Sequence, residues 1–209
     1  MVICRFLGRS CLEIIGLKDH IIIDPNYIEN PKKGIEKIFI THEHEDHFNL
    51  KKINKIRHDY SLENKNIEIF GPKSIKNEFD LNYNRIKNGL KIKLDNFIID
   101  AFKIDCYKSK ECYAYLISKG DIRLLHTADS SHFSNELRNL NLEVDYCFIA
   151  CYEDEFSNYL KFLNHISPKI TFPYHFGQGK EENAKKLSSL IMESGLESKF
   201  LEIGAEFGF

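Results

Sequence analysis

Short apolar segments separated by turn residues open the chain. Three of them come first, at residues 2–7, 11–15 and 20–24. Glycine-containing turns lie between them, a pattern typical of short antiparallel strands that follow one another in a sheet. The opening therefore predicts a three-stranded β-meander, after which Pro25-Asn26 begins a polar loop.

The rest of the chain predicts strands and helices in alternation. We expect strands at residues 38–41, 67–70, 90–94, 97–104, 112–117, 122–126, 146–150, 170–174 and 200–203. We expect helices at residues 50–57, 72–79, 134–140, 153–165 and 181–193, the last of them ended by Gly195. Meanders in both halves, with helices concentrated after each, indicate two sheets packed face to face with helices outside. The expected fold is α/β, a four-layer α/β/β/α sandwich.

Length and charge narrow the class of protein. With 209 residues and 43% hydrophobic content, the chain can bury one substantial core, which predicts a single domain over residues 1–209. The formal net charge of -2 gives no basic surface for nucleic acid or an anionic membrane. No apolar run approaches the ~20 residues of a membrane span, and residues 1–5 lack the layout of a signal peptide. These features predict a cytoplasmic protein.

Cysteine usage agrees with that compartment. The six cysteines form no C-x-x-C pair, and they are Cys4, Cys11, Cys106, Cys112, Cys147 and Cys151. Four of them lie in apolar, strand-like segments. In a reducing cytosol we expect most to be free thiols that are buried as small hydrophobic side chains.

The highest density of potential metal ligands lies directly after the strand expected at residues 38–41. Here the sequence reads His42-Glu43-His44-Glu45-Asp46-His47. On an extended or turning loop, His42 and His44 can point the same way, while Asp46 and His47 turn toward a second point. Neutral imidazole is the commonest metal ligand, so one loop can supply ligands to two adjacent metal ions. The alternative is a solvated surface turn.

Two further strand exits carry matching chemistry. Asp129 closely follows the strand expected at 122–126, and His175 directly follows the strand expected at 170–174. A two-metal site needs a carboxylate that can bridge and at least one more histidine, and these residues provide both. Three such segments far apart in the sequence favour a metal site over an accidental cluster.

Several segments together resemble one known family. They are Leu7-Gly8-Arg9-Ser10-Cys11, Ile23-Asp24-Pro25, Thr41 to His47 (T-H-x-H-x-D-H), Ala128-Asp129 and Pro173-Tyr174-His175-Phe176-Gly177. They resemble the metallo-β-lactamase superfamily, and within it the compact hydrolases related to L-ascorbate-6-phosphate lactonase. The resemblance runs essentially end to end.

The resemblance implies a set of ligands. His42 and His44 would bind a first metal, Asp46, His47 and His175 a second, with Asp129 bridging the two. Asp24 would orient the histidine loop, although an aspartate before a proline can also be a simple turn residue. The implied metal is one or two Zn²⁺ ions, with Mn²⁺ or Fe²⁺ as alternatives.

The implied reaction is hydrolysis. A metal-bound hydroxide would attack a small ester, lactone or phosphodiester, and Asp46 would help to hold it. His132 is expected to serve as an auxiliary ligand or proton donor, and Tyr174 to contact the substrate. The expected partner is a small-molecule substrate, with neither nucleic acid nor membrane, and the sequence leaves open whether the chain forms a homo-oligomer.

Two departures from the family pattern matter. Relatives usually carry a third histidine for the first metal, where this chain has none between 105 and 112, and Cys106, Tyr107 and Glu111 are candidate replacements. Alternatively, Cys106 and Cys112 are merely buried and the first metal binds weakly. That leaves a second hypothesis, a catalytically weakened metal- or ligand-binding protein of the same fold. Arg9 stands where many relatives have histidine. It would favour an anionic substrate if it lies at the mouth of the cleft, and the alternative, a lone surface arginine, is the commoner case.

Overall fold

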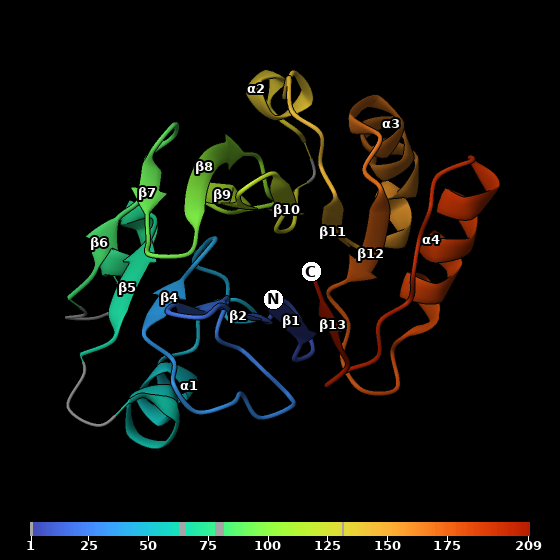
Figure 1. The fold of residues 1–209 in the computed structure, drawn as a ribbon. Coiled ribbons are helices and arrows are strands. Elements are labelled where there is room, and N and C mark those ends of the chain that lie inside the picture. The colour runs from blue at the N-terminus through green and yellow to red at the C-terminus, as the bar shows by residue number, and fades with distance from the viewer. Residues whose placement is uncertain (1, 63–65, 78–81, 131) are drawn as a thin grey trace.

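Two β-sheets lie face to face in the computed structural model, with helices on their outer sides (Figure 1). The structure describes residues 2–62, 66–77, 82–130 and 132–209. The first sheet contains, in spatial order, β13 (Glu206–Gly208), β1 (Ile3–Phe6), β2 (Leu12–Ile15), β3 (His20–Ile23), β4 (Lys37–Phe39), β5 (Glu68–Gly71) and β6 (Asn84–Arg85). The second contains β12 (Ile170–Tyr174), β11 (Tyr146–Ala150), β10 (Ile122–His126), β9 (Cys112–Lys119), β8 (Ile98–Ile104) and β7 (Lys91–Lys93).

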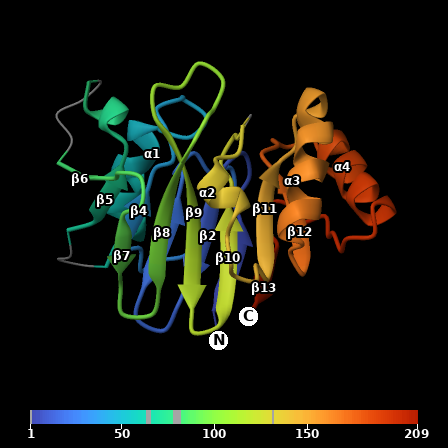
Figure 2. The same ribbon diagram turned by 90° about the horizontal axis from the view of Figure 1, so that it is seen from above.

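Helices cover the outer face of each sheet, which gives the predicted α/β/β/α layers (Figure 1). Seen from above, strands of the second sheet lie over strands of the first (Figure 2). The α-helices are α1 (Leu50–Lys55), α2 (Asn135–Arg138), α3 (Phe156–Ile166) and α4 (Glu182–Glu193). A π-helical turn, Ile56–Tyr60, continues α1, and 3-10 turns span Lys73–Asn77 and Glu153–Glu155. The helix expected at 72–79 is thus a 3-10 turn as far as residue 77, and residues 78–79 lie outside the described part of the chain.

Alternation along the central strands explains why both faces of the first sheet are buried. In β3, Ile21 and Ile23 belong to the core between the sheets, whereas Ile22 belongs to the core beneath α1 with Ile53 of that helix. Successive side chains of a strand point to opposite faces, so a fully apolar strand needs a partner layer on each side. Aromatic side chains join the two sheets, as in the contact of Phe39 with Tyr115 at 5.7 Å between ring centroids.

Strand direction determines where the site lies. β3 and β4 are parallel in the first sheet, and β10, β11 and β12 are mutually parallel in the second. The carboxyl ends of parallel neighbours meet at one edge of a sheet, and loops at such an edge can vary without disturbing the core. The expected ligand segments all follow the carboxyl ends of these strands.

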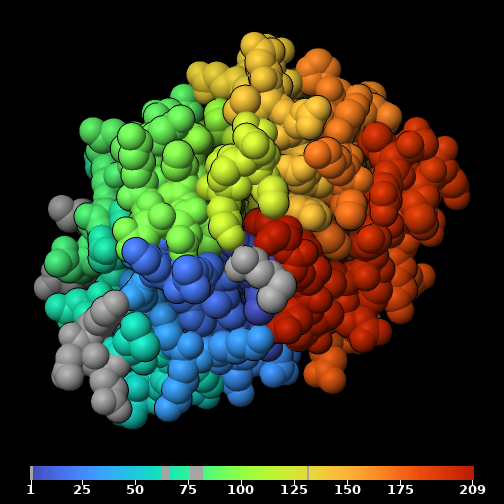
Figure 3. Space-filling model, viewed as in Figure 1, coloured from blue at the N-terminus to red at the C-terminus, as the bar shows by residue number. Residues whose placement is uncertain are grey.

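The end of the chain differs from the prediction. β11 and β12 have the expected bounds, but residues 200–203 form no strand, and β13 pairs instead with β1. Gly204 explains the difference, because its φ of 85° turns the chain and its N–H donates to Phe6 O at 2.7 Å. The turn brings the C-terminal segment beside the N-terminal strands, as the red and blue surfaces in Figure 3 show.

Two further observations concern the cysteines and the helices. All six cysteines are free, as predicted, and all but the half-buried Cys106 are buried. Among the described residues, no helix has the length and apolar character needed to cross a lipid bilayer.

Candidate metal centre

The histidine loop is fixed by a carboxylate at the end of β3. Asp24 accepts hydrogen bonds from the N–H and the hydroxyl of Thr41, both at 2.8 Å. Its Oδ2 also lies 2.6 Å from Nδ1 of His47. These contacts confirm that Asp24 orients the loop, because one buried side chain holds both its first and its last residues.

The opening turn of the chain supports the same loop. Ser10 Oγ donates to Asp46 O at 2.6 Å, and Asn26 Nδ2 donates to Glu45 O at 2.8 Å. The N–H of Arg9 donates to Phe176 O at 2.7 Å, which places this turn beside the segment that carries His175. The loop backbone is therefore held from both sides.

Three residues at strand exits have a left-handed backbone. The φ angles are 51° for Asp24, 50° for Ala128 and 74° for His175. Non-glycine residues rarely adopt this conformation, which costs of order 1 kcal/mol and is found most often at functional sites. At each exit the left-handed residue ends the extended strand conformation. The chain therefore changes direction there, which lets His175 itself and Asp129, the residue after Ala128, turn toward the site.

One group of possible ligands gathers around His47. Asp46, His47, Asp129 and His175 place one ligand atom each within 4.8 Å of one another. His47 Nε2 lies 2.9 Å from Asp129 Oδ2 and 3.0 Å from His175 Nε2, while Asp46 Oδ2 lies 3.3 Å from His175 Nε2. The structure thus brings together the four residues expected at the second metal and at the bridge.

A second group gathers around His42. His42 Nε2 lies 3.0 Å from His44 Nδ1 and 3.7 Å from Cys106 Sγ. Asp129 Oδ2 is 4.0 Å from the same His42 nitrogen, so this carboxylate stands between the two groups. Of the three candidates for the missing histidine, Cys106 alone joins the group. Tyr107 is 73% exposed, and Glu111 accepts a hydrogen bond from Lys73 N at 2.7 Å.

The charges at the centre are strongly coupled. Burial alone would lower the pKa of His47, but Asp129 and Asp24 raise it well above 6.5. Burial would raise the pKa of Asp129, yet His175 and His47 hold it far below 3.8. Burial and the neighbouring His47 lower the pKa of His42 to about 3. Where His47 holds a proton between two carboxylates, a metal cation would bind in competition with that proton.

The donor set fits a divalent metal. Tetrahedral zinc with nitrogen and oxygen ligands separates them by about 3.3 Å, and the distances around His47 are close to this value. Asp129 is 8% exposed, and its Oδ1 makes no hydrogen bond within the described chain. A buried carboxylate oxygen costs free energy unless a cation or donor compensates it. His175 Nε2 lies 3.4 Å from this oxygen and is itself a candidate ligand.

Two expected residues lie elsewhere. His132 belongs to neither ligand group: its backbone pairs with Asp105, and its exposed side chain lines a separate cavity of about 240 Å³. Tyr174 is 1% exposed and contacts Phe6 in the core, so the expected contact with substrate is wrong. Its position in the buried strand β12 explains this, since the chain turns toward the site only at His175.

A tyrosine that sequence reasoning missed lies at the centre. Tyr152 follows β11 and donates to Asp129 Oδ2 at 3.0 Å, while its hydroxyl is 3.1 Å from His175 Nδ1. Burial and the charge of Asp129 raise the pKa of Tyr152, so the hydroxyl keeps its proton at neutral pH. The sequence pointed to Tyr152 only through its position. It follows a strand that lies, along the chain, between the strand before Asp129 and the strand before His175.

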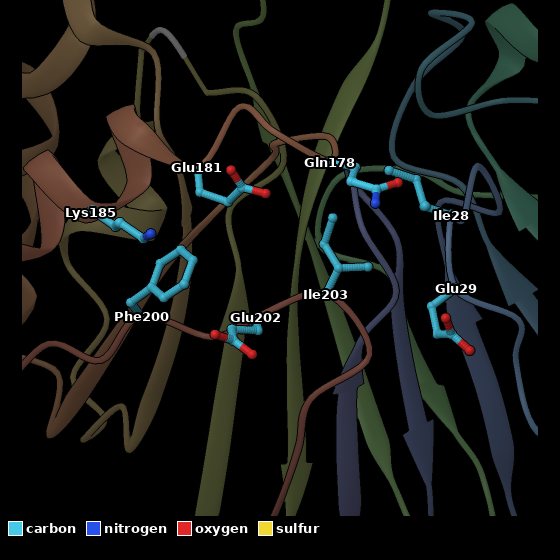
Figure 4. Close-up of a pocket in the computed structure, with 8 residues that line it drawn as sticks. All are labelled: Ile28, Glu29, Gln178, Glu181, Lys185, Phe200, Glu202 and Ile203. Atoms are coloured by element: carbon cyan, nitrogen blue, oxygen red, sulfur yellow. The ribbon is translucent and has the colours of Figure 1, made fainter.

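Two cavities distinguish the centre from the rest of the surface. One of about 280 Å³ is lined by members of both ligand groups, His44, Cys106, Asp46 and Asp129, together with Tyr152. Another of about 390 Å³ is lined by Glu29, Glu181, Glu202 and Lys185, and none of the ligand candidates reaches it (Figure 4). The smaller cavity is therefore the candidate substrate pocket.

Comparison with known proteins gives a consistent result. The family model described as the beta-lactamase superfamily domain matches residues 4–175. A UPF0173 protein of Pyrococcus abyssi is 26% identical over 179 residues, which cover 81% of either chain. The structure of Igni18, a metallo hydrolase from Ignicoccus hospitalis, has a TM-score of 0.77 at 18% identity and covers 100% of this chain and 99% of its own.

A further solved structure with a similar fold is that of a diiron enzyme. CmlA, a diiron beta-hydroxylase from Streptomyces venezuelae, has a TM-score of 0.77 at 13% identity, with 100% of this chain and 54% of its own covered. At sequence identities of 18% and 13%, the two structures show that this chain has the same fold, and nothing more.

Proposed function

The chain belongs to the beta-lactamase superfamily, and from this premise we propose that it is a metal-dependent hydrolase of small esters or lactones. The observation that carries the proposal is the position of Asp129. Its Oδ2 lies 2.9 Å from His47 Nε2 and 4.0 Å from His42 Nε2, so it reaches both ligand groups at the wall of one cavity. A carboxylate in that position suits a pair of metal ions.

The residues of the centre have separable roles. A divalent metal, when bound, would lower the pKa of a water ligand toward ~7 and polarise the bond to be cleaved. Asp46 and Asp129 supply the negative charge that the cations need. Tyr152 donates its single hydroxyl hydrogen to Asp129 and so holds that carboxylate in place. If the O–H rotates away from Asp129, the protonated hydroxyl can instead donate to an oxygen of the substrate.

The size and charge of the pocket favour an uncharged substrate. Its volume of about 280 Å³ is at the lower end for small-molecule sites. Asp154 and Glu155 line it beside Tyr152, and carboxylates repel an anionic group in this position. An ester or lactone fits these walls better than a polyanion, which also supports a partner other than nucleic acid.

One observation favours a second candidate, a small phosphodiester. A second groove that Asp46 lines contains Arg9 and Lys51, together with Glu45. These cations would attract a phosphate, as expected for Arg9 from the sequence. The two candidates differ in which of the two cavities lined by Asp46 receives the substrate.

We propose Zn²⁺ as the metal, with Mn²⁺ or Fe²⁺ as alternatives. Nitrogen, oxygen and sulfur donors together suit zinc, whereas the likeness to a diiron enzyme supports iron. We further propose that the chain is one domain that works in the cytoplasm, where free cysteines such as the six found here persist.

The test combines metal analysis with hydrolysis. The purified protein should contain about two metal ions per chain and hydrolyse members of a panel that includes p-nitrophenyl acetate, γ-butyrolactone and bis(p-nitrophenyl) phosphate. His47→Ala should lower that activity at least about 100-fold, because it removes a ligand. His58→Ala is the matched control, since its side chain is 89% exposed away from the centre.

The panel also separates the competing hypotheses. Metal-loaded protein that hydrolyses no member supports the binding protein without efficient catalysis. Equal activity of His47→Ala and the unaltered protein would rule out the proposed centre as the seat of catalysis.

A further inference from the structure

Cys106 occupies the place at which the first ligand group lacks a histidine. We propose that Cys106 binds the first metal ion as a thiolate, together with His42 and His44. This inference rests on the proposed function, because it concerns the same centre. It makes the two metal positions chemically unlike, one with sulfur and one with oxygen and nitrogen alone.

The distances suit a thiolate ligand. Tetrahedral zinc places two nitrogen ligands about 3.3 Å apart and a nitrogen and a sulfur about 3.6 Å apart. His42 Nε2 lies 3.0 Å from His44 Nδ1 and 3.7 Å from Cys106 Sγ. The half-buried thiol also lines the substrate pocket, so a metal ion and solvent can reach it.

The hydrogen bonds of His42 direct its free lone pair toward Cys106. The Thr41 hydroxyl donates to Asp24, so it accepts a hydrogen bond from His42 Nδ1–H at 3.0 Å. This leaves the lone pair of His42 on Nε2, the nitrogen nearest Cys106. A second cysteine, Cys112, is buried at 3.5 Å from Nδ1, on the protonated side of the ring, and is not placed to share the metal.

A glutamate between the two histidines holds the loop that carries Cys106. Glu43 accepts hydrogen bonds from Lys110 N at 2.7 Å and from Ser109 Oγ at 3.1 Å. At the other end of the loop, Asp105 pairs with the backbone of His132. The thiol is thus held beside His42 by contacts that involve no metal, which makes the first group preorganised.

A thiolate changes which metal the first position prefers. Sulfur is a soft ligand that favours Zn²⁺ or Co²⁺ over Mn²⁺. On binding, the metal replaces the proton of the thiol, and the proton is released to solvent. Zinc should therefore occupy both positions, whereas manganese should occupy only the second with useful affinity.

Cobalt spectroscopy tests the proposal without an activity assay. The full chain is reduced, stripped of metal with a chelator and titrated with Co²⁺ under anaerobic conditions. A thiolate ligand produces a sulfur-to-cobalt charge-transfer band in the near ultraviolet. The unaltered protein should bind two Co²⁺ and show the band, and Cys112→Ser should do the same.

Three variants make the assignment specific. Cys106→Ser should lose the band and bind the first ion at least about 100-fold more weakly. Cys106→His should lose the band but still bind two ions. Glu43→Gln removes no ligand. It should lower the affinity for the first Co²⁺ roughly 10-fold, while the charge-transfer band persists at saturation. Circular dichroism establishes that each variant is folded.

The results that overturn the proposal are distinct from failure of the proposed function. Two bound Co²⁺ without a charge-transfer band, or a band that Cys112→Ser abolishes and Cys106→Ser retains, would refute the role of Cys106 while leaving a metal hydrolase intact. A folded chain that binds no Co²⁺ would refute both.

Discussion

Oδ2 of Asp24 lies 2.6 Å from Nδ1 of His47, and this contact ties the end of β3 to the histidine loop. The same carboxylate also binds the backbone and hydroxyl of Thr41. Metal-binding histidines commonly donate their second ring N–H to a carboxylate, which fixes the ring and makes it a stronger ligand. We therefore expect Asp24 to strengthen the binding of a metal by His47 in the proposed centre, without being a ligand itself.

Asp24→Asn should weaken metal binding at the second position by about 10- to 100-fold. The new amide places N–H donors against the donors of His47 and Thr41, which should also cost about 1–3 kcal/mol in the free energy of unfolding. Competition with a chromogenic chelator measures the first effect, and urea denaturation of the metal-free protein measures the second.

Asp145→Asn is the matched control for this change. Asp145 also accepts a backbone N–H, from Arg123 at 2.8 Å, but it lies at the opposite end of the parallel strands from the centre. Equal losses of metal affinity in the two variants would contradict the role assigned to Asp24.

Tyr152→Phe should reduce kcat by about 100-fold on any substrate that proves to be hydrolysed. The variant removes the hydroxyl that donates to Asp129 and leaves the ring and all metal ligands in place. Tyr107→Phe is the control, since Tyr107 lines the same cavity with a side chain that is 73% exposed. Steady-state kinetics gives kcat for both variants and the unaltered protein, and the metal content of each is measured in parallel. A loss explained wholly by lower metal content would refute a direct role.

Removal of the metal should lower the melting temperature by about 10 °C. A ligand present at about 1,000 times its Kd adds about 4 kcal/mol to the free energy of unfolding, and each kcal/mol shifts Tm by about 2–4 °C in a chain of this length. Calorimetry before and after chelation measures the change. His47→Ala should show a smaller shift, and a shift equal to that of the unaltered protein would place the metal elsewhere.

His126 should make the metal-free protein less stable as the pH falls from about 6.5 to about 4. Burial lowers the pKa of His126 from 6.5 to about 4, and its Nδ1 accepts a hydrogen bond from Ala128 N. In that interval the unfolded chain takes up a proton that the folded chain does not, so stability is present above the interval and lost within it. The full effect is about 3 kcal/mol.

His126→Phe should lower the slope of this dependence by about half, because buried His42, whose pKa is lowered to about 3, loses stability over the same interval. Urea denaturation at several pH values gives the slope of stability against pH, which does not depend on any constant cost of fitting the larger ring. A slope that matches the unaltered protein would show that other groups account for the loss.

Much of the fold could be predicted because local patterns and final environment agree. β11 and β12 are short apolar runs that become buried strands, and the turn at Gly8 produces the expected meander. The two groups of candidate ligands could be predicted for the same reason, since Asp129 closely follows such a run and His175 directly follows another.

The rest depended on contacts that no local pattern reveals. The apolar residues at 200–203 look like a strand, yet they lie on a turn set by Gly204, and pairing passes to β13. Tyr152 joins the centre only because β11 lies between β10 and β12 in the sheet. The choice of Cys106 over Tyr107 required the position of a loop that Glu43 holds from 60 or more residues away.

The candidate ligands come from both sheets, with His42 to His47 following β4 and Asp129 and His175 following β10 and β12. We therefore expect the centre to form only after the two sheets have docked, late in folding. Interactions that arise after the transition state slow unfolding and leave the folding rate nearly unchanged. A metal bound here should therefore lengthen the lifetime of the native state far more than it hastens its formation.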